Sequence, residues 1–331
     1  MNRVTLGHIA KISGFSIKTV SRVVNNEKSV SDKTRKEILR VIRKYDFKPN
    51  IFAKNLKKRK SYTVGLIVHN ITNPYMPELI ETIEREISQS HDEYSILLSI
   101  SDISEKSKRE CIRNMIDKMV DGLIITNMHR ENQKDLEYLK GNSVPFVLVL
   151  NRLNGFESNY VGADFYFGSI KMMSYLYGLG LRKIAFITGT PDNISSAERL
   201  QGYKSFLLKH DLSCDDSLIE TGDFKYAGGF SAFNKLLSRN PDLEAVFCVN
   251  DYTALGALDA ARKLQIKVPD DLVIVGFDDM HIASHSNIGL TTMRIPILKM
   301  AKAAVRILFG QIDGKKKRCQ KVILKPELVI R

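Results

Sequence analysis

TLGHIAKISGFSIKTVSRVVN, residues 5–25, is the stretch that decides the fold of the first part of this chain. Thr5 is a plausible N-cap, and apolar residues follow it at helical spacing. Gly14 then supplies the backbone freedom that a sharp turn needs, and Ser16 is placed to cap a second helix. Two short helices joined by a glycine-containing turn are the signature of a helix-turn-helix motif.

The second helix is predicted to have two chemically different faces, and a third helix is expected from Ser31-Asp32 to about Tyr45. The residues predicted to form the core of this unit include Val20, Val23, Val24, Ile38, Leu39, Ile42 and Tyr45. The opposite face of the second helix carries Ile17, Lys18, Ser21 and Arg22. Lysine and arginine can donate to guanine, and isoleucine can contact a thymine methyl. The alternative is an ordinary solvated basic face.

The distribution of charge favours the DNA-reading interpretation. Residues 1–60 hold 17 Lys and Arg against 4 Asp and Glu, whereas the rest of the chain holds 33 of each. The whole formal net charge of +13 therefore lies in the first sixty residues. Such asymmetry is typical of a polyanion-binding segment attached to a neutral domain.

Residues 46–60 connect this unit to the rest of the chain. Pro49 is expected to end the third helix, and Asn50 could cap one more short helix over 50–57. Leu56 would then be an apolar residue with basic neighbours, the arrangement that minor-groove proteins use to open a base step. A flexible basic linker is the alternative interpretation.

From Tyr62 onward, short apolar runs alternate with helical patterns. The predicted strands are 64–68, 95–98, 122–125, 146–150, 184–187, 245–249 and 272–277, and the predicted helices are 76–90, 104–119, 195–209, 225–238, 251–264 and 297–309. This alternation indicates parallel sheets covered on both faces by helices. Because there are too many units for one compact sheet, we expect two similar subdomains.

Polar residues recur where the predicted strands end, and ligands of open α/β sheets bind beyond those ends. The residues concerned are Asn70, Asn127, Asn151, Arg152, Thr188, Asn250, Asp251 and Asp278. Together with Arg199 they suit a small polar ligand with several hydroxyl groups. Asn and Asp are also common in loops and helix caps, so each of them alone could be structural.

Other functional classes find little support in the sequence. No phosphate-binding loop, nucleophile elbow or zinc-protease motif is present, so we expect no catalytic residue and no cofactor. His281 and His285 lack further ligands at regular spacing, and the four cysteines form no metal or redox motif, so no metal site is expected either. Without a membrane-length apolar run or signal peptide, we expect a cytoplasmic, nucleoid-associated protein.

The sequence resembles the LacI-type (lac and purine repressor) family, with the matching motifs in the same order over essentially the whole chain. The matching stretches include Gly14-Phe15-Ser16, Thr19-Val20-Ser21-Arg22-Val23-Val24-Asn25, Pro49-Asn50, Asn73-Pro74-Tyr75, Ala197-Glu198-Arg199-Leu200-Gln201-Gly202-Tyr203, Asn250-Asp251 and Val275-Gly276-Phe277-Asp278-Asp279. The resemblance implies a transcription regulator, most simply a repressor, that binds a palindromic operator as a homodimer.

The resemblance also implies a multidomain fold. A small all-α helix-turn-helix headpiece (1–48) and a hinge helix or linker (49–60) would precede an α/β periplasmic-binding-protein-like core of two doubly wound subdomains. The core (61–331) would divide into an N-subdomain (61–161 and 291–322) and a C-subdomain (162–290 and 323–331), joined by three crossovers. The implied DNA-binding residues are Thr5, Ser16, Ile17, Lys18, Thr19, Ser21, Arg22, Asn25, Asn50, Ala53 and Leu56.

A sugar-like effector would bind between the two subdomains. By motif position, the resemblance places its contacts on Tyr75, Met76, Asn151, Arg199, Phe224, Asn250 and Asp278. This chain departs from the family pattern at three places: Asn151 replaces a frequent Asp, Asp164-Phe165 replaces Asp-Asn and makes that wall more aromatic, and Asp46-Phe47 replaces Gly-Tyr.

Two alternatives remain open. A catabolite-control type of regulator would use a phosphorylated carrier protein as corepressor, and the sequence shows no docking surface that would identify it. A solute-binding protein, from a different functional class, would need only the core. The basic headpiece argues against that class, because a transport receptor has no use for +13 within sixty residues.

Overall fold

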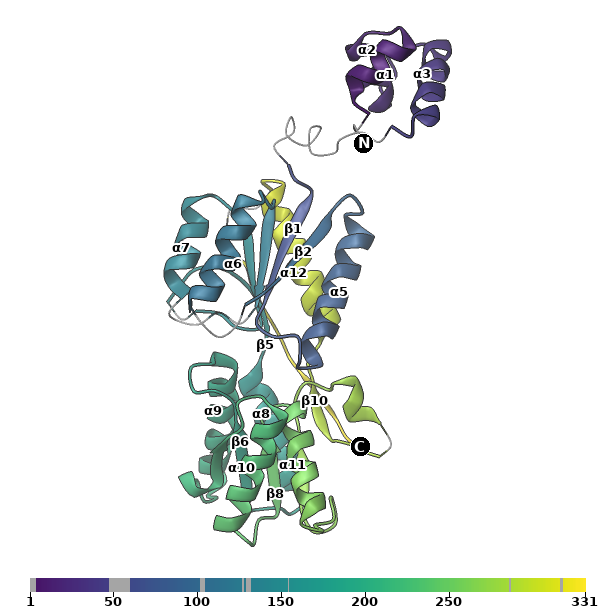
Figure 1. The fold of residues 1–331 in the computed structure, drawn as a ribbon. Coiled ribbons are helices and arrows are strands. Elements are labelled where there is room, and N and C mark those ends of the chain that lie inside the picture. The colour runs from purple at the N-terminus through teal and green to yellow at the C-terminus, as the bar shows by residue number, and fades with distance from the viewer. Residues whose placement is uncertain are drawn as a thin grey trace. The chain divides into compact units, whose positions relative to one another are not determined.

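The computed structural model describes residues 4–47, 60–101, 105–126, 128, 132–153, 155–285, 287–315 and 318–331. The chain divides into two units, Met1–Ser61 and Tyr62–Arg331, which Figure 1 shows. The first unit is called the headpiece and the second the core. Among the described residues, no helix has both the length and the apolar character needed to cross a bilayer.

The headpiece contains α1 (Leu6–Ser13), α2 (Ile17–Val24) and α3 (Asp32–Lys44). The Thr5 hydroxyl accepts a hydrogen bond from the backbone N of His8, and the Ser16 hydroxyl accepts one from the backbone N of Thr19. Gly14 ends α1 in the left-handed conformation, at φ 72°. Both predicted N-caps and the glycine turn of the helix-turn-helix motif are therefore confirmed.

The three helices enclose a small apolar core. Its buried residues are Ile9, Ala10, Val20, Val23, Ile38 and Phe47. The predicted place of Tyr45 in this core is wrong, because Tyr45 is exposed. The helix ends at Lys44, and Asp46 adopts a left-handed backbone at φ 42°, which turns the chain so that Phe47 closes the core instead.

The core consists of two subdomains, which are called the first and second layers below. The first layer is built on a parallel six-stranded sheet in the order β11-β5-β4-β3-β1-β2. Its strands are β1 (Thr63–Val68), β2 (Ser95–Ile100), β3 (Gly122–Thr126), β4 (Phe146–Val149), β5 (Asn159–Ala163) and β11 (Lys321–Leu324). Helices α5 (Tyr75–Ser90) and α12 (Ile297–Ile312) cover one face, and α6 (Glu105–Asp117) and α7 (Gln133–Gly141) cover the other, as Figure 1 shows.

The second layer repeats this plan with four parallel strands in the order β7-β6-β8-β9. They are β6 (Ile184–Thr188), β7 (Ile219–Thr221), β8 (Ala245–Cys248) and β9 (Val273–Val275). Helices α8 (Phe165–Gly178) and α9 (Ile194–Lys209) cover one face, and α10 (Tyr226–Arg239) and α11 (Asp251–Lys263) cover the other. Short one-turn helices η2 (Asp216–Leu218) and η3 (His281–Ser284) complete this part. The prediction of two doubly wound α/β subdomains is confirmed.

Two antiparallel strands, β10 (Thr292–Arg294) and β12 (Glu327–Val329), form a separate small sheet where the chain crosses between the two layers. The predicted boundaries at 161/162 and 322/323 fall inside strands β5 and β11 of the first sheet. All seven predicted strands and all six predicted helices of the core are present, with ends that shift by up to three residues.

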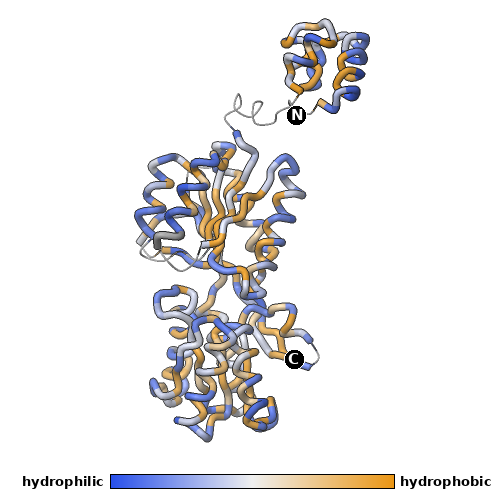
Figure 2. The backbone as a smooth tube through the Cα atoms, viewed as in Figure 1, coloured by the Kyte–Doolittle hydropathy of each residue, from blue (hydrophilic) through white to orange (hydrophobic). Residues whose placement is uncertain are grey.

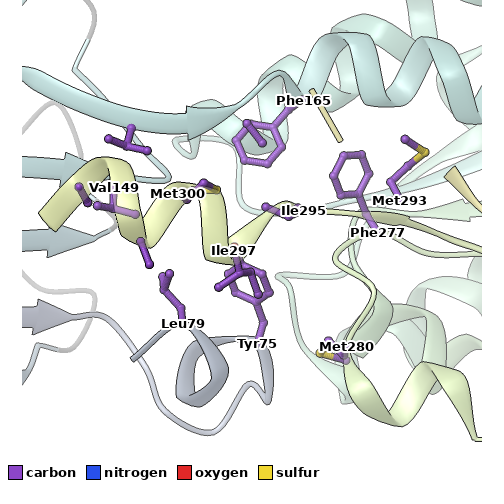
Figure 3. Close-up of a cluster of buried hydrophobic side chains, with 14 of the residues drawn as sticks. Tyr75, Leu79, Val149, Phe165, Phe277, Met280, Met293, Ile295, Ile297 and Met300 are labelled. Atoms are coloured by element: carbon purple, nitrogen blue, oxygen red, sulfur yellow. The ribbon is translucent and has the colours of Figure 1, made fainter. Parts of the chain in front are cut away.

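One apolar cluster runs from the first layer through the crossover strands into the second. Figure 2 shows the apolar positions concentrated along the strands, inside the covering helices. Figure 3 shows the part where the layers meet, with Tyr75 and Leu79 of α5 facing Ile297, and with Phe165 near Phe277. Continuous packing here means that the relative position of the layers depends on buried side chains at their junction.

Candidate DNA-reading surface and effector site

The start of α2 presents the side chains that the sequence assigned to DNA. Ile17 has 59% of its surface exposed, and Lys18 is exposed beside it. The Ser16 and Thr19 hydroxyls form a hydrogen bond of 2.9 Å, and the Ser16 hydroxyl also caps the helix. The exposed Ile17 and Lys18 side chains are thus accessible to a partner.

Arg22 and Asn25 lie toward the end of the same helix. Arg22 Nε lies 3.7 Å from Glu27 Oε2, with both side chains about half exposed. Asn25 Nδ2 donates to Ser21 Oγ at 3.4 Å. A water-exposed ion pair of this kind is weak, so Glu27 leaves the guanidinium of Arg22 available to a base.

The remaining predicted DNA-binding residues are Thr5, which caps α1, and three residues of the linker. Thr5 and His8 form a reciprocal capping box, with Thr5 N donating to His8 Nδ1 at 3.4 Å. The histidine was not identified from sequence because Glu or Gln is the usual residue there. Asn50, Ala53 and Leu56 lie outside the described residues, as does Asn127 of the core.

Arg199 is the centre of the predicted effector site in the core. Its side chain, on α9, is only 3% exposed, and its guanidinium lies 4.2 Å from the ring centroids of both Phe165 and Phe277. Asp278 follows β9, and its Oδ1 lies 3.4 Å from Arg199 Nη2. This is longer than the usual 2.7–2.9 Å or so of a charge-assisted hydrogen bond. A ligand hydroxyl could therefore compete for either group.

Burial sets the ionisation of these groups. It raises the pKa of Asp278 to about 7, an effect that Arg199 opposes and Glu78 reinforces. Burial lowers the pKa of Arg199, and Asp278 opposes that change. The pKa of Asp251 is raised well above its usual range by burial and then by Asp278. The site thus holds one strongly buried cation beside carboxyl groups that are poised to accept a proton.

Tyr75 comes from the opposite layer, at the start of α5. It is 5% exposed, and burial raises the pKa of its phenol well above the usual range, with Asp278 adding to the rise. Its hydroxyl and Arg199 Nε are both buried, and neither has a hydrogen-bond partner among the described residues. Buried polar atoms usually have a partner in native proteins, so these two atoms are available to a ligand group or to a water molecule.

Asn151 follows β4 and connects the same two layers. Its Oδ1 accepts a hydrogen bond of 3.3 Å from the backbone N of Ser195 on α9. The Ser195 hydroxyl in turn accepts a hydrogen bond of 3.3 Å from Arg199 Nη1. Beside it, Arg152 Nη2 donates to Glu198 Oε1 at 2.7 Å. Ser195 was not identified from the sequence, because serine at a helix start indicates only a cap.

The other three predicted effector residues make their described contacts with other parts of the core. Asn250 is fully buried, and its Oδ1 caps α11 by accepting from the backbone N of Thr253 at 2.9 Å. Phe224, in a left-handed backbone at φ 58°, packs its ring against Gly189, where an added Cβ would lie 2.2 Å from the ring. Met76 is half buried against the apolar core. The structure thus brings Tyr75, Asn151, Arg199 and Asp278 together.

Two cavities lie away from these residues. One, of about 270 Å³, is lined by residues such as Lys140, Ser158 and Cys319. The other, of about 500 Å³, lies beside the crossover strands and is lined by residues such as Phe167, Lys299 and Pro326. None of the seven predicted effector residues lines either cavity. The candidate site is therefore defined by its cluster of buried polar side chains and not by either of these cavities.

Comparison with known proteins defines the class. Residues 5–50 match the family described as "Bacterial regulatory proteins, lacI family", and residues 173–331 match the "Periplasmic binding protein-like domain". The HTH-type transcriptional regulator DegA of Bacillus subtilis (strain 168) is 31% identical over 99% of this chain and 97% of its own length.

Solved structures agree. The Lac repressor dimer bound to operator and the anti-inducer ONPF matches with a TM-score of 0.90 at 25% identity, over 100% of this chain and 98% of that one. The complex of the transcriptional regulator CelR with cellobiose matches with a TM-score of 0.76 at 29% identity, over 99% of both chains. The protein belongs to the LacI family of DNA-binding transcription regulators.

Proposed function

We propose that this protein is a repressor that binds a palindromic operator as a homodimer and responds to a sugar or sugar derivative bound between the two layers of its core. The relatives support this proposal by their described partners, which are an operator for the Lac repressor dimer and cellobiose for CelR. The N-terminal basic helices would supply phosphate and base contacts. The effector would act by favouring one of two core arrangements.

The observation that carries the effector proposal is the pair of unsatisfied atoms, Tyr75 Oη and Arg199 Nε. They come from opposite layers, and each is electrostatically coupled to Asp278. A polyhydroxyl ligand can accept from Arg199 Nε and exchange hydrogen bonds with the phenol, which satisfies both at once. Such a ligand would hold the two layers together and shift the population toward the closed arrangement.

The DNA half of the proposal is tested by selection from random duplex DNA with the full-length protein, with and without added sugars. We expect enrichment of a pseudo-palindrome with two close half-sites. Deletion of residues 1–60 should abolish that enrichment and leave the core folded. Specific binding that survives the deletion would show that the headpiece is not the DNA reader.

The effector half is tested with Tyr75→Phe. Because the hydroxyl is buried without a partner, its removal should stabilise the ligand-free protein by about 1 kcal/mol or leave it unchanged. The same change should weaken sugar binding about tenfold, measured by thermal shift and calorimetry against D-ribose, D-glucose, cellobiose and their phosphates. Leu79→Ala, in the adjoining apolar core, is the control that should lower stability. Unchanged affinity in Tyr75→Phe would remove the phenol from the site.

A further inference from the structure

Asp279 is held by two arginines in an ion-pair cluster at the edge of the core, in which the Arg294 side chain is 52% exposed. Arg294 Nε donates to Asp279 Oδ2 and Arg331 Nη2 donates to Asp279 Oδ1, each at 2.6 Å. The Asp279 side chain is 8% exposed, and that of Arg331 is 18% exposed. Each carboxylate oxygen thus has its own guanidinium, an arrangement that fixes both position and rotation of the carboxylate. We call these three residues the Asp279 clamp.

Both arginines of the clamp come from the crossover segments. Arg294 is the last residue of β10, and Arg331 follows β12, its antiparallel partner. Arg331 is itself anchored, because its Nη1 donates to Leu290 O at 2.9 Å and its backbone N donates to Thr291 Oγ1 at 3.0 Å. The clamp therefore connects Asp279 to the chain on both sides of the small sheet that links the two layers.

The backbone at Asp278 needs such support. Asp278 has φ 117° and Asp279 has φ 57°, and L-residues other than glycine rarely adopt such values. Strained residues persist only where the surroundings determine them. Asp278 N donates to Met293 O at 2.8 Å, and an isolated bridge pairs Asp278 with Arg294. The direction of the Asp278 carboxylate toward Arg199 thus depends on how its neighbour and β10 are held.

We propose that the Asp279 clamp positions Asp278 for the effector and couples the effector site to the crossover strands. Arg331 and Arg294 are then positioning residues of that site, although neither touches Arg199 or Tyr75. A change of angle between the layers moves β10 and β12, and the clamp passes that movement to Asp278. This inference rests on the proposed function only in its assignment of Asp278 to the effector.

The first test needs no ligand. Hydrogen exchange of the full-length protein is compared for the wild type, Arg331→Gln, Arg331→Lys and the control Arg262→Gln, which alters an exposed arginine paired loosely with Asp259. Arg331→Gln should speed exchange of the amides of residues 278–280 at least about tenfold, because one charge-assisted contact is lost. Arg331→Lys should restore part of the protection, and Arg262→Gln should match the wild type.

Unchanged exchange at residues 278–280 in Arg331→Gln overturns the clamp. If Arg331→Gln does not fold, Arg294→Gln gives the same test through the other carboxylate oxygen of Asp279. Faster exchange throughout the core, rather than in this segment, also overturns the proposal, because it indicates a general stabilising role.

The second test measures coupling to the effector with the sugar panel named above. A sugar that stabilises the wild type should bind at least about tenfold more weakly to Arg331→Gln and equally well to Arg262→Gln. Equal affinity for Arg331→Gln overturns the positioning role. If no sugar stabilises the wild type, the proposed effector class fails, and the exchange result still decides the clamp.

Discussion

Arg152 Nη2 lies 2.7 Å from Glu198 Oε1 and joins the loop after β4 to α9 of the other layer. The two side chains are 30% and 20% exposed, so the pair is partly shielded from water. Arg152 follows Asn151 in the sequence, and Glu198 precedes Arg199. Because formation of this contact requires the two layers to be close at the candidate effector site, it is a direct measure of their relative position.

We predict that Arg152 and Glu198 are energetically coupled. A double-mutant cycle with Arg152→Gln and Glu198→Gln should give a coupling of about 1 kcal/mol in urea unfolding of the core. The exposed pair Arg85 and Glu81 on α5 is the matched control and should give about 0.3–0.5 kcal/mol. Additive effects at Arg152 and Glu198 would mean that the contact does not contribute to the closed arrangement.

The second prediction concerns Asp278 and pH. Its folded pKa of about 7 lies above the ordinary value of 3.8, so the folded protein binds the proton more tightly than the unfolded chain. Its stabilising contribution is complete below about pH 4 and is lost as the pH rises through 7. Between pH 5 and pH 8 the wild type should lose about 1–3 kcal/mol of unfolding free energy relative to Asp278→Asn.

The measurement is chemical unfolding of both proteins at several pH values. The comparison uses the slopes rather than the absolute stabilities, because Asp278→Asn also removes the negative partner of Arg199. Parallel pH profiles for the two proteins would show that Asp278 does not titrate in this range. Asp242→Asn, at a fully exposed carboxylate whose pKa is lowered by Lys183, should leave the slope between pH 5 and pH 8 unchanged.

The sequence predicted much of the fold for identifiable reasons. Seven core strands are apolar runs bounded by helices, whereas β7 and β11 are short strands with exposed residues and resemble loops in sequence. Helix α8 was not identified because its own aromatic and aliphatic residues lie on most sides of it, so the sequence lacks the polar stripe of an amphipathic helix. Periodicity is informative only where one face of an element meets water.

The candidate site was predictable in part. Arg199 and Asp278 were identified from motif position, and the aromatic wall was expected from Phe165. The two-sided contact of Arg199 with Phe165 and Phe277 depends on how the start of α8 packs against the segment that follows β9, and a single sequence does not specify such packing. The left-handed backbone of Asp278 could not be predicted either, because most aspartates have a negative φ. The cap formed by Asn250 is the structural alternative that the sequence left open.

The third prediction concerns Asp46, which stands where the family pattern has glycine. Its φ of 42° lies in the region where a Cβ is unfavourable, and the turn that it forms places Phe47 in the headpiece core. Asp46→Gly should therefore stabilise the headpiece by about 0.5–1 kcal/mol, and Asp46→Ala should destabilise it. Hydrogen exchange of the buried amides of Val20 and Ile38 measures both effects. The opposite order would show that the aspartate side chain stabilises the turn.

The last prediction separates base reading from general attraction to DNA. Arg22 lies on the exposed face of α2, and its ion pair with Glu27 is a long one of 3.7 Å. Arg22→Ala should cost about 1–3 kcal/mol on the selected operator and much less on random DNA, because a guanidinium that donates to guanine discriminates between bases. Lys58→Ala, in the basic segment, should weaken both complexes alike and reduce the salt dependence. Fluorescence anisotropy at several salt concentrations gives both quantities, and equal losses on the two DNAs for Arg22→Ala would assign that residue to the phosphate backbone instead.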